Sequence, residues 1–238
     1  MKTIGLVIAT LALIAMGGCA STTRIEARDS RIVLPSVKAS LNFGKGTDTP
    51  SNPQDGHAVE FEALRAKGSA AQSLAPGQSS IVLDGKTFVA PEQLHHDFRF
   101  DYADISWRWR RFFGGGDLGL EVLAGVAVAE VEINTASPTL QASQGFHTRG
   151  AQGGVGLIWR AQPGTSLALR AREFASLLTG VGRAGLAEVS LTQALGRNVS
   201  VRLGYARWEV EGQELSNSSA FRLRFSGPSL QLQFDFGS

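Results

Sequence analysis

The chain has 238 residues, of which 43% are apolar and 18% are charged, and its formal net charge at pH 7 is only +2. So small a charge gives no support for binding nucleic acid, and a single cysteine excludes an intramolecular disulfide. Arginine outnumbers lysine by 18 to 5, and no lysine follows Lys86. This bias indicates that little of the later chain faces plain water.

The first residues have the pattern of a secretory signal peptide. Met1–Thr3 is short and basic, residues 4–16 are mainly apolar, and two glycines precede Cys19. The apolar run is shorter than the roughly 20 residues that a membrane-spanning helix needs. We therefore expect residues 1–18 to be a signal peptide that is removed on export.

The stretch Met16-Gly17-Gly18-Cys19 resembles the lipobox of bacterial lipoproteins, although leucine is commoner than methionine at its first position. In that family an aliphatic residue and two small residues precede the cysteine that is lipidated. The resemblance implies a lipid such as palmitate on Cys19, and the alternative is ordinary cleavage that leaves a free thiol. Ala20 and Ser21 follow instead of the aspartate that retains lipoproteins at the inner membrane. The resemblance therefore implies the outer membrane of a Gram-negative bacterium.

From residue 57 onward, apolar and polar residues alternate with the period of a β-strand, whose successive side chains point to opposite faces. Before this, residues 20–35 are polar and predict a tether, and 36–46 is a candidate short strand. Eight strands are expected, at 57–68, 95–112, 118–135, 147–161, 165–177, 184–195, 198–212 and 219–237. A chain built almost wholly of amphipathic strands closes into a barrel or stacks into a sandwich.

The expected connections alternate in length, as is typical of outer-membrane barrels. Tight turns are expected at 114–117, 162–164 and 196–198, and longer loops at 69–94, 136–146, 178–183 and 213–218. Eight strands place both chain ends on the rim with the tight turns, which we expect to be periplasmic. A strand at 36–46 gives nine, and a further one at 79–90 gives ten, although 79–90 looks more like a hairpin. We prefer eight strands, with ten as the alternative.

Two of the expected strands change the parity of their apolar residues. In the strand 95–112 the apolar residues are first even-numbered and then odd-numbered: Phe98, Phe100 and Tyr102, then Ile105, Trp107 and Trp109. The last strand shows a similar change across Ser226-Gly227-Pro228. A β-bulge adds one residue and re-aims the faces, so we expect a bulge in each strand. For the last strand, a turn that splits it in two is the alternative.

Three features favour an apolar face that points outward, toward lipid. The polar face is rich in glycine and serine, which a narrow lumen filled by side chains requires. Aromatic residues gather at strand ends, as in the girdles of membrane barrels. Phe234 and Phe236 resemble the terminal strand that the bacterial barrel-assembly machinery reads, although Gly237 and Ser238 follow them. Over residues 57–238 the pattern resembles the broad class of small, eight-stranded outer-membrane proteins.

If the apolar face points outward, the polar face lines the lumen. Buried charges must be paired and hydrogen-bonded, so we expect an arginine–carboxylate network that plugs the lumen. Its expected members are Glu121, Arg170, Arg172, Glu188, Arg202, Arg222, Arg224 and Asp235. A structural plug is a better explanation of these charges than a conducting pore.

The histidines are the candidate catalytic bases of a rival hypothesis, a lipid-modifying enzyme. His95, His96 and His147 lie near expected outer loops and His57 near the other rim. The His-x-Ser spacing of lipid A deacylases is absent. His95 and His96 are adjacent on a strand and point to opposite faces, which makes them poor metal ligands. We therefore expect no catalytic site, no metal and no cofactor.

The sequence thus predicts an all-β, antiparallel up-and-down transmembrane β-barrel of the outer membrane. Its expected parts are a signal peptide (1–18), a lipidated N-terminus with a periplasmic tether (19–56) and the barrel (57–238). We expect a structural or surface-interaction role, with a lipid-modifying enzyme and a soluble lipocalin-like lipid carrier as alternatives. Expected partners are outer-membrane lipid and the barrel-assembly and lipoprotein-sorting machineries, with no nucleic acid, for a monomer.

Overall fold

The computed structural model describes residues 24–29, 32–43, 55–78, 80–113, 116–176, 182–213 and 220–236. The expected signal peptide and Cys19 lie outside the described residues. Within them the chain is almost entirely β-strand, so the all-β prediction is confirmed. The strands are β1 (Arg24–Asp29), β2 (Leu34–Phe43), β3 (Gly56–Leu74), β4 (Ile81–Leu83), β5 (Lys86–Phe88), β6 (Glu92–Phe113), β7 (Leu118–Ala136), β8 (Gln141–Gln162), β9 (Thr165–Ser176), β10 (Gly182–Ala194), β11 (Val199–Gln213) and β12 (Ala220–Phe236).

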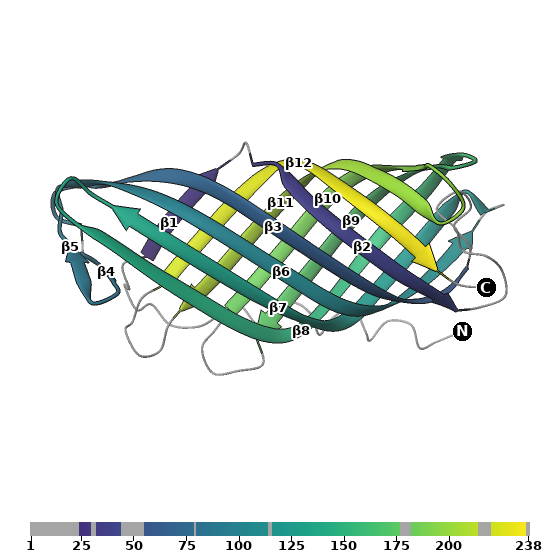
Figure 1. Ribbon diagram of the computed structural model, residues 1–238, viewed down its shortest axis with the longest axis horizontal. Helices are drawn as coiled ribbons and strands as arrows, with labels where there is room; N and C mark the ends of the chain where they lie inside the picture. The colour runs from purple at the N-terminus through teal and green to yellow at the C-terminus, as the bar shows by residue number, and fades with distance from the viewer. Residues whose placement is uncertain are drawn as a thin grey trace, which may run out of the picture.

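Ten of these strands form one large sheet that closes on itself, with the strands inclined to its long axis (Figure 1). Neighbours are antiparallel in the order β2-β3-β6-β7-β8-β9-β10-β11-β12. Strand β12 then returns to the first strand, because its residues 229–236 pair in parallel with residues 34–41 of β2. The result is a barrel-like ring that is antiparallel except at one seam.

Strand β1 continues this parallel seam toward the other end of the ring. Its residues 24–29 pair in parallel with residues 220–225 of β12, so β1 and β2 are two halves of one interrupted N-terminal strand. The ring therefore has nine positions, and the prediction of eight strands was wrong. Part of the expected tether, 20–35, belongs to the sheet. A parallel seam removes the requirement for an even number of strands, because only an all-antiparallel ring needs one.

The segment 79–90 forms a separate hairpin of β4 and β5, as expected, and does not supply a further strand of the ring. Asp84 and Gly85 both have positive φ, at 49° and 69°, and Asp-Gly is a preferred sequence for such a two-residue hairpin turn. Ile81, Leu83 and Phe88 of the hairpin are buried and join the apolar core. The hairpin lies at the end of the ring opposite the C-terminus (Figure 1).

The two ends of the ring differ in their connections. One end carries the connections 75–91, 137–140, 177–181 and 214–219, and we name it the loop end. The other carries 44–55, 114–117, 163–164 and 195–198, and we name it the turn end. Strand β1 starts at the loop end and β12 finishes at the turn end. The expected barrel, residues 57–238, does begin and end at the turn end, because β3 also starts there, whereas the additional N-terminal strand β1 starts at the loop end.

Neither of the two expected bulges is present. Strand β6 pairs with β3 and with β7 in unbroken register along its whole length. Strand β12 likewise pairs with β11 without a shift, from Ala220 to Phe234. The described sheet does have an irregularity, between Arg160 and Gln162 where β8 meets β9. The parity change in the sequence therefore needs another cause.

That cause is an inversion of polarity along each strand, which β7 shows clearly. The residues of β7 that point outward are apolar near the turn end and polar near the loop end: Leu118, Leu120, Val122, Ala124, Val126 and Val128, then Glu130, Glu132 and Asn134. The inward residues change in the opposite sense, from Glu121 to Val131 and Ile133. The outward face of β7 thus changes from apolar to polar residues at a single level, while the strand and its pairing continue without interruption.

Around the ring the outward residues of the turn half form an apolar belt. Its strongly exposed members are Val37, Leu41, Phe43, Val59, Phe61, Ile105, Trp107, Phe113, Leu118, Val126, Val128, Val155, Leu157, Trp159, Leu167, Leu169, Val189, Leu191, Leu203, Tyr205, Leu230, Leu232 and Phe236. The outward residues of the loop half form a charged collar, linked by pairs such as Arg99 with Glu132 at 2.9 Å. The sheet is therefore apolar outside at one end and polar outside at the other.

Inside the loop half, the ring is filled by an aromatic cluster. Phe100 and Tyr102 of β6 contact Trp208 of β11, with ring centroids 5.2 Å apart in both pairs. Phe225 of β12 lies 5.5 Å from Phe100, and Phe174 of β9 lies 6.4 Å from Tyr102. These strands are not all neighbours in the sheet, so the side chains meet across its interior. This half of the ring therefore has an apolar, largely aromatic core.

The seam between the N-terminal strand and β12 requires a glycine. The backbone N–H of Ile32 donates to the carbonyl oxygen of Ser226 at 3.3 Å. A Cβ atom at Gly227 would lie 2.0 Å from the carbonyl oxygen of Ile32, far inside van der Waals contact. Gly227 thus permits the close approach of the N-terminal strand to β12, at the position where the sequence predicts a bulge.

Candidate functional site

The inside of the turn half holds a dense group of charged side chains, which we name the charge network. Its members are at most 8% exposed and come from seven strands: Lys38, Glu60, Glu62, Asp104, Arg108, Arg110, Glu121, Arg170, Arg172, Arg202 and Asp235. Such groups are stable away from water only when they are paired and hydrogen-bonded. The stability of the charge network therefore depends on its internal ion pairs and hydrogen bonds.

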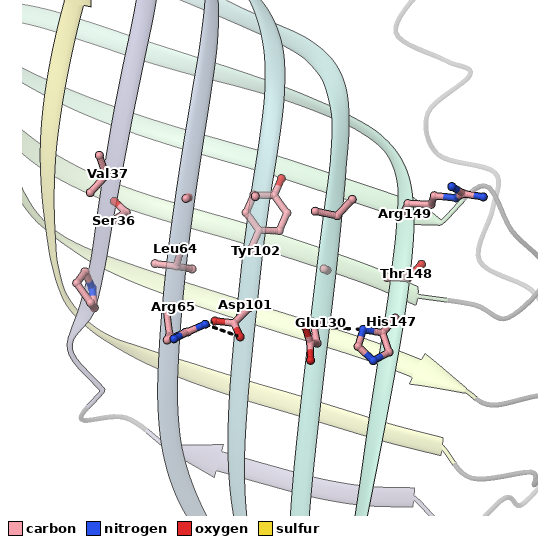
Figure 2. Close-up of a pocket in the computed structure, with 15 residues that line it drawn as sticks. Ser36, Val37, Leu64, Arg65, Asp101, Tyr102, Glu130, His147, Thr148 and Arg149 are labelled. Carbon is pink, nitrogen blue, oxygen red and sulfur yellow. Dashed lines mark hydrogen bonds and ion pairs between the residues drawn. The ribbon is translucent and has the colours of Figure 1, made fainter.

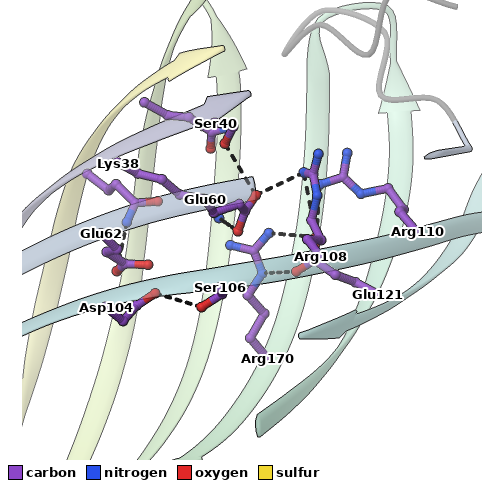
Figure 3. A network of polar contacts seen from close by, with 12 residues as sticks. Lys38, Ser40, Glu60, Glu62, Asp104, Ser106, Arg108, Arg110, Glu121 and Arg170 are labelled. Carbon is purple, nitrogen blue, oxygen red and sulfur yellow. Dashed lines mark hydrogen bonds and ion pairs between the residues drawn. The ribbon is translucent and has the colours of Figure 1, made fainter. Parts of the chain in front are cut away.

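Glu121 of β7 is the centre of the charge network (Figure 3). Its carboxylate accepts a hydrogen bond from Arg110 Nη2 at 2.8 Å, and two from Arg170, at 2.8 Å from Nε and 3.2 Å from Nη2. Arg108 Nη1 lies 4.0 Å from the same carboxylate. A completely buried anion is thus surrounded by three guanidinium groups.

Arg170 reaches Glu121 across an intervening strand. Gly156 of β8 lies between them in register, opposite Glu121 on one side and opposite Arg170 on the other. A Cβ atom at Gly156 would lie 3.2 Å from Arg170 Cγ and 3.5 Å from Glu121 Cβ. Because Gly156 has no side chain, the side chain of Arg170 can pass over it to reach Glu121. This is the role expected for small residues on the polar face.

Two further carboxylates extend the charge network toward β2 and β9. Glu60 of β3 forms an ion pair with Lys38 and lies 3.2 Å from Arg108 Nη1. Glu62 accepts a hydrogen bond from Arg172 Nη2 at 2.8 Å, and the other terminal nitrogen of that arginine lies 3.5 Å from Asp104. Because β3 and β9 are not neighbours, the Arg172–Glu62 pair crosses the interior of the ring.

Six of the predicted lumen residues lie on the inner face. Glu121, Arg170, Arg172, Arg202 and Asp235 are buried, and Glu188 is half-buried. Arg202 donates to Thr192 and Gln233, each at 3.1 Å, and Gln233 in turn donates to Asp235 at 2.8 Å. Glu188 accepts a hydrogen bond from Ser229 at 3.1 Å. These residues form a continuous polar lining on β9 to β12.

The other two predicted lumen residues, Arg222 and Arg224, lie on the outer face of the loop half. They pair with Glu209 across the β11–β12 ladder, and Arg222 also pairs with Glu211 at 2.7 Å. Their placement in the lumen was wrong because it assumed a bulge between them and Asp235. Without a bulge, even-numbered residues of β12 point outward along its whole length.

Sequence reasoning missed six of the eleven members of the charge network. The missed residues are Lys38, Glu60, Glu62, Asp104, Arg108 and Arg110. The signal that reveals them is the alternation itself, since Glu60 stands between Val59 and Phe61, and Arg108 between Trp107 and Trp109. Each occupies the polar face of a strand whose apolar face is clear.

The histidines do not assemble into one site. His95 is exposed and its Nε2 lies 3.3 Å from Asp97, whereas His96 is buried on the opposite face. His147 is 71% exposed and lies 3.8 Å from Glu130, and His57 stacks on Trp107 at the other end of the ring, with centroids 5.3 Å apart. Among the described residues, no group of three His, Cys, Asp or Glu side chains is placed to hold a metal ion.

Phe234 and Phe236, the predicted assembly signal, point outward near the turn end, where Phe236 is 51% exposed. Their recognition by assembly machinery stays a prediction. No helix within the described ranges has the length and apolar character needed to cross a membrane. No protein-family model, curated protein or solved structure matches this chain.

His96 is a titratable group that is buried inside the loop half. Its Nδ1 lies 2.8 Å from Thr135 Oγ1 and its Nε2 lies 3.1 Å from Gln72 Oε1. Burial, with a smaller contribution from neighbouring His95, lowers the pKa of His96 from 6.5 to about 4. The imidazole is therefore neutral in the folded protein at pH 7.

We predict that replacing Glu121 by Leu lowers the free energy of unfolding by about 3–5 kcal/mol, because arginines that are fully buried lose their shared anion. The measurement is thermal or denaturant unfolding of the protein in detergent. The matched control is Glu173→Gln, which breaks the exposed pair with Arg183 on the outer face and should cost less than about 1 kcal/mol. Equal melting of Glu121→Leu and the unmodified protein contradicts the assigned role.

We predict an acid-dependent loss of stability that His96 controls. The folded-state pKa, about 4, lies below the ordinary value of 6.5, so the unfolded chain takes up the proton first as the pH falls. The contribution is complete above pH 6.5 and is lost progressively down to about pH 4, by ~3 kcal/mol in total. When the free energy of unfolding is plotted against pH over this range, the slope should become small in His96→Gln and stay steep in the exposed control His95→Gln. An identical slope in both variants refutes the assignment.

Proposed function

We propose that this protein is an integral β-barrel lipoprotein of the outer membrane with a structural or surface-interaction role and no catalytic activity. Residues 1–18 are its signal peptide and Cys19 carries its lipid. The observation that carries the proposal is the inversion of polarity at one level around the closed ring. A bilayer that surrounds only the turn half accounts for both halves of the molecule.

The height of the apolar belt supports this proposal. On β7 the outward residues are apolar from Leu118 to Val128. These residues span roughly 33 Å along the strand, or roughly 25 Å across a membrane at a tilt of about 40°. This matches the apolar band of outer-membrane barrels. Exposed aromatic residues lie at the turn-end margin of the belt, where an interfacial girdle is expected: Phe43, Phe113, Trp159 and Phe236.

The loop half has the reverse distribution of polarity, with charged residues outside and apolar residues inside. Its outer face carries the charged collar, and its inside holds the aromatic cluster around Phe100 and Trp208. That arrangement suits water outside, so we place this half beyond the bilayer. Short turns are periplasmic in outer-membrane barrels, and the loop end then faces the cell exterior.

The structural role is supported by the filling of the interior at both levels. The Arg172–Glu62 pair crosses the turn half, and the contact of Phe100 with Trp208 crosses the loop half. Because these side chains meet across the ring, they plug its interior. The surfaces that remain for contact with other molecules are the collar and the β4–β5 hairpin.

The lipid on Cys19 belongs at the loop end in this proposal. Strand β1 begins there at Arg24, and the five peptide units that join Cys19 to Arg24 span at most about 17 Å. We therefore place the lipid on the cell-surface side, in place of the expected periplasmic tether at the turn end.

The two alternatives fit the molecule less well. A soluble lipid carrier would expose the whole apolar belt to water, although soluble monomers rarely show apolar patches larger than a few hundred Å². It would also bury the charge network at its centre. A lipid-modifying enzyme would need an oriented nucleophile and base, whereas the polar partners of His95 and His147 in the described structure are the carboxylates of Asp97 and Glu130, and His96 is enclosed.

We predict that Ala124→Arg destabilises the protein in lipid vesicles by about 2–4 kcal/mol, because it places a charge against the middle of the bilayer. The matched control is Asn134→Arg, ten positions further along the same outward face of β7 but in the collar, which should be nearly neutral. Both sites are exposed, so a soluble barrel would tolerate both variants alike. Denaturant unfolding in vesicles measures the difference, and equal stability of the two variants contradicts the proposal.

We predict that Cys19→Ser abolishes incorporation of labelled palmitate yet leaves the protein in the outer-membrane fraction after a carbonate wash. The strands hold the protein in the bilayer without the lipid, and it should still show heat-modifiable migration on a gel. Release of a folded Cys19→Ser protein into the soluble fraction would favour the lipocalin-like carrier.

A further inference from the structure

The outer wall of the ring is hollowed where the apolar belt meets the charged collar. One hollow, of about 870 Å³, crosses strands β2, β3, β6, β7 and β8 (Figure 2). Its outward lining combines belt and collar residues: Pro35, Val37, Ala63, Ala103, Val128, Arg65, Asp101, Glu130, His147 and Arg149. The small side chains of Ala63 and Ala103 create the depression between larger neighbours.

A second hollow, of about 490 Å³, continues the first one into the belt. The two share Ala103, Val128 and Arg149, and the second is otherwise lined outward by Phe61, Ile105 and Val126. Together they form a furrow that is charged at its loop-end margin and apolar along the rest of its length. We name it the β6–β8 furrow.

The head of the β6–β8 furrow carries charges of both signs. Arg65 pairs with Asp101, and Arg99 pairs with Asp101 at 3.0 Å, with Glu130 at 3.2 Å and with Glu132 at 2.9 Å. Figure 2 shows the row from Arg65 to His147 across neighbouring strands. No described residue forms an ion pair with Arg149. A guanidinium group outside these pairs therefore lies at the junction of the polar and apolar parts.

The same arrangement recurs elsewhere on the wall. A hollow of about 510 Å³ crosses β7 to β11 and is lined outward by Leu120, Val155, Leu157, Leu169, Ala171, Ala187, Val189 and Tyr205, with Arg207 at its loop-end margin. Among described residues, Arg207 too has no ion-pair partner. Small residues again open the depression, since Ala171 and Ala187 are opposite each other in the β9–β10 ladder. We name it the β9–β11 furrow.

We propose that each furrow binds one phosphate-bearing glycerolipid, whose phosphate pairs with Arg149 in one furrow and with Arg207 in the other, while an acyl chain lies along the apolar lining. A guanidinium group offers two parallel hydrogen bonds to a phosphate, and this pairing is strong at a margin partly shielded from water. The order of cation and apolar groove along the wall matches the order of headgroup and chain in such a lipid. The inference rests on the proposed insertion of the belt into a membrane.

The test is native mass spectrometry of the detergent-solubilised full chain after incubation with phosphatidylglycerol. The unmodified protein should retain up to two lipid molecules, Arg149→Gln and Arg207→Gln up to one each, and the double variant none. Lys86→Gln is the control, because it removes an exposed cation from the β4–β5 hairpin, which lines neither furrow, and should retain two. Diacylglycerol, which has the chains but no phosphate, should not be retained by any of these proteins.

Equal retention by the double variant and the unmodified protein would overturn the proposal, and so would retention of diacylglycerol at the level of phosphatidylglycerol. Loss of lipid in the Lys86→Gln control would show that only net charge matters, which also refutes it. Carbonate extraction of the same proteins keeps the two proposals apart. A protein that stays in the membrane but retains no lipid refutes the furrows alone, whereas a protein that is washed out refutes the proposed function.

Discussion

Parallel pairing of the N-terminal strand with β12 is the constraint on which the rest of the structure depends. It joins residues 34–41 to residues 229–236, almost the two ends of the described chain, and so turns an open sheet into a ring. Only in a closed ring does the polar face of each strand become an interior. Glu121 can then be surrounded by arginines from β6 and β9, and Phe100 can meet Trp208 across the lumen.

The interior of the ring meets two different demands along its length. In the turn half the outward residues are apolar, and the inside is a charge network in which Glu60, Glu62 and Glu121 each have cationic partners. In the loop half the outward residues are charged and the inside is aromatic. The two fillings suit two different surroundings, so the level at which they meet marks the proposed edge of the bilayer. The furrows headed by Arg149 and Arg207 lie at that same level.

The wrong bulges and the misplaced arginines of the sequence interpretation have one physical origin. Apolar residues that change parity within β6 and β12 are explained equally well by an added residue or by an exchange of inside and outside polarity. With a bulge, each face of the strand keeps the same surroundings and the added residue shifts which positions point to it. With the inversion, the strand stays regular and the surroundings of each face change along its length. The strand itself carries no mark that distinguishes them, and the misplacement of Arg222 and Arg224 followed from the wrong choice. Strand β1 was missed because its six residues are mostly polar and pair with a strand nearly 200 positions away.

The sequence by itself determined the all-β class, most of the strands, the hairpin at 79–90 and which residues of a strand share a face. These follow from an alternation of period two and from turn residues such as Asp84-Gly85, which act over a few positions. Only the tertiary structure decided the number of strands, the parallel seam, the start of β1 at the loop end and the inward or outward direction of each face. Those features depend on contacts between distant strands, such as Arg172 with Glu62, and no local pattern encodes which distant strand completes the ring.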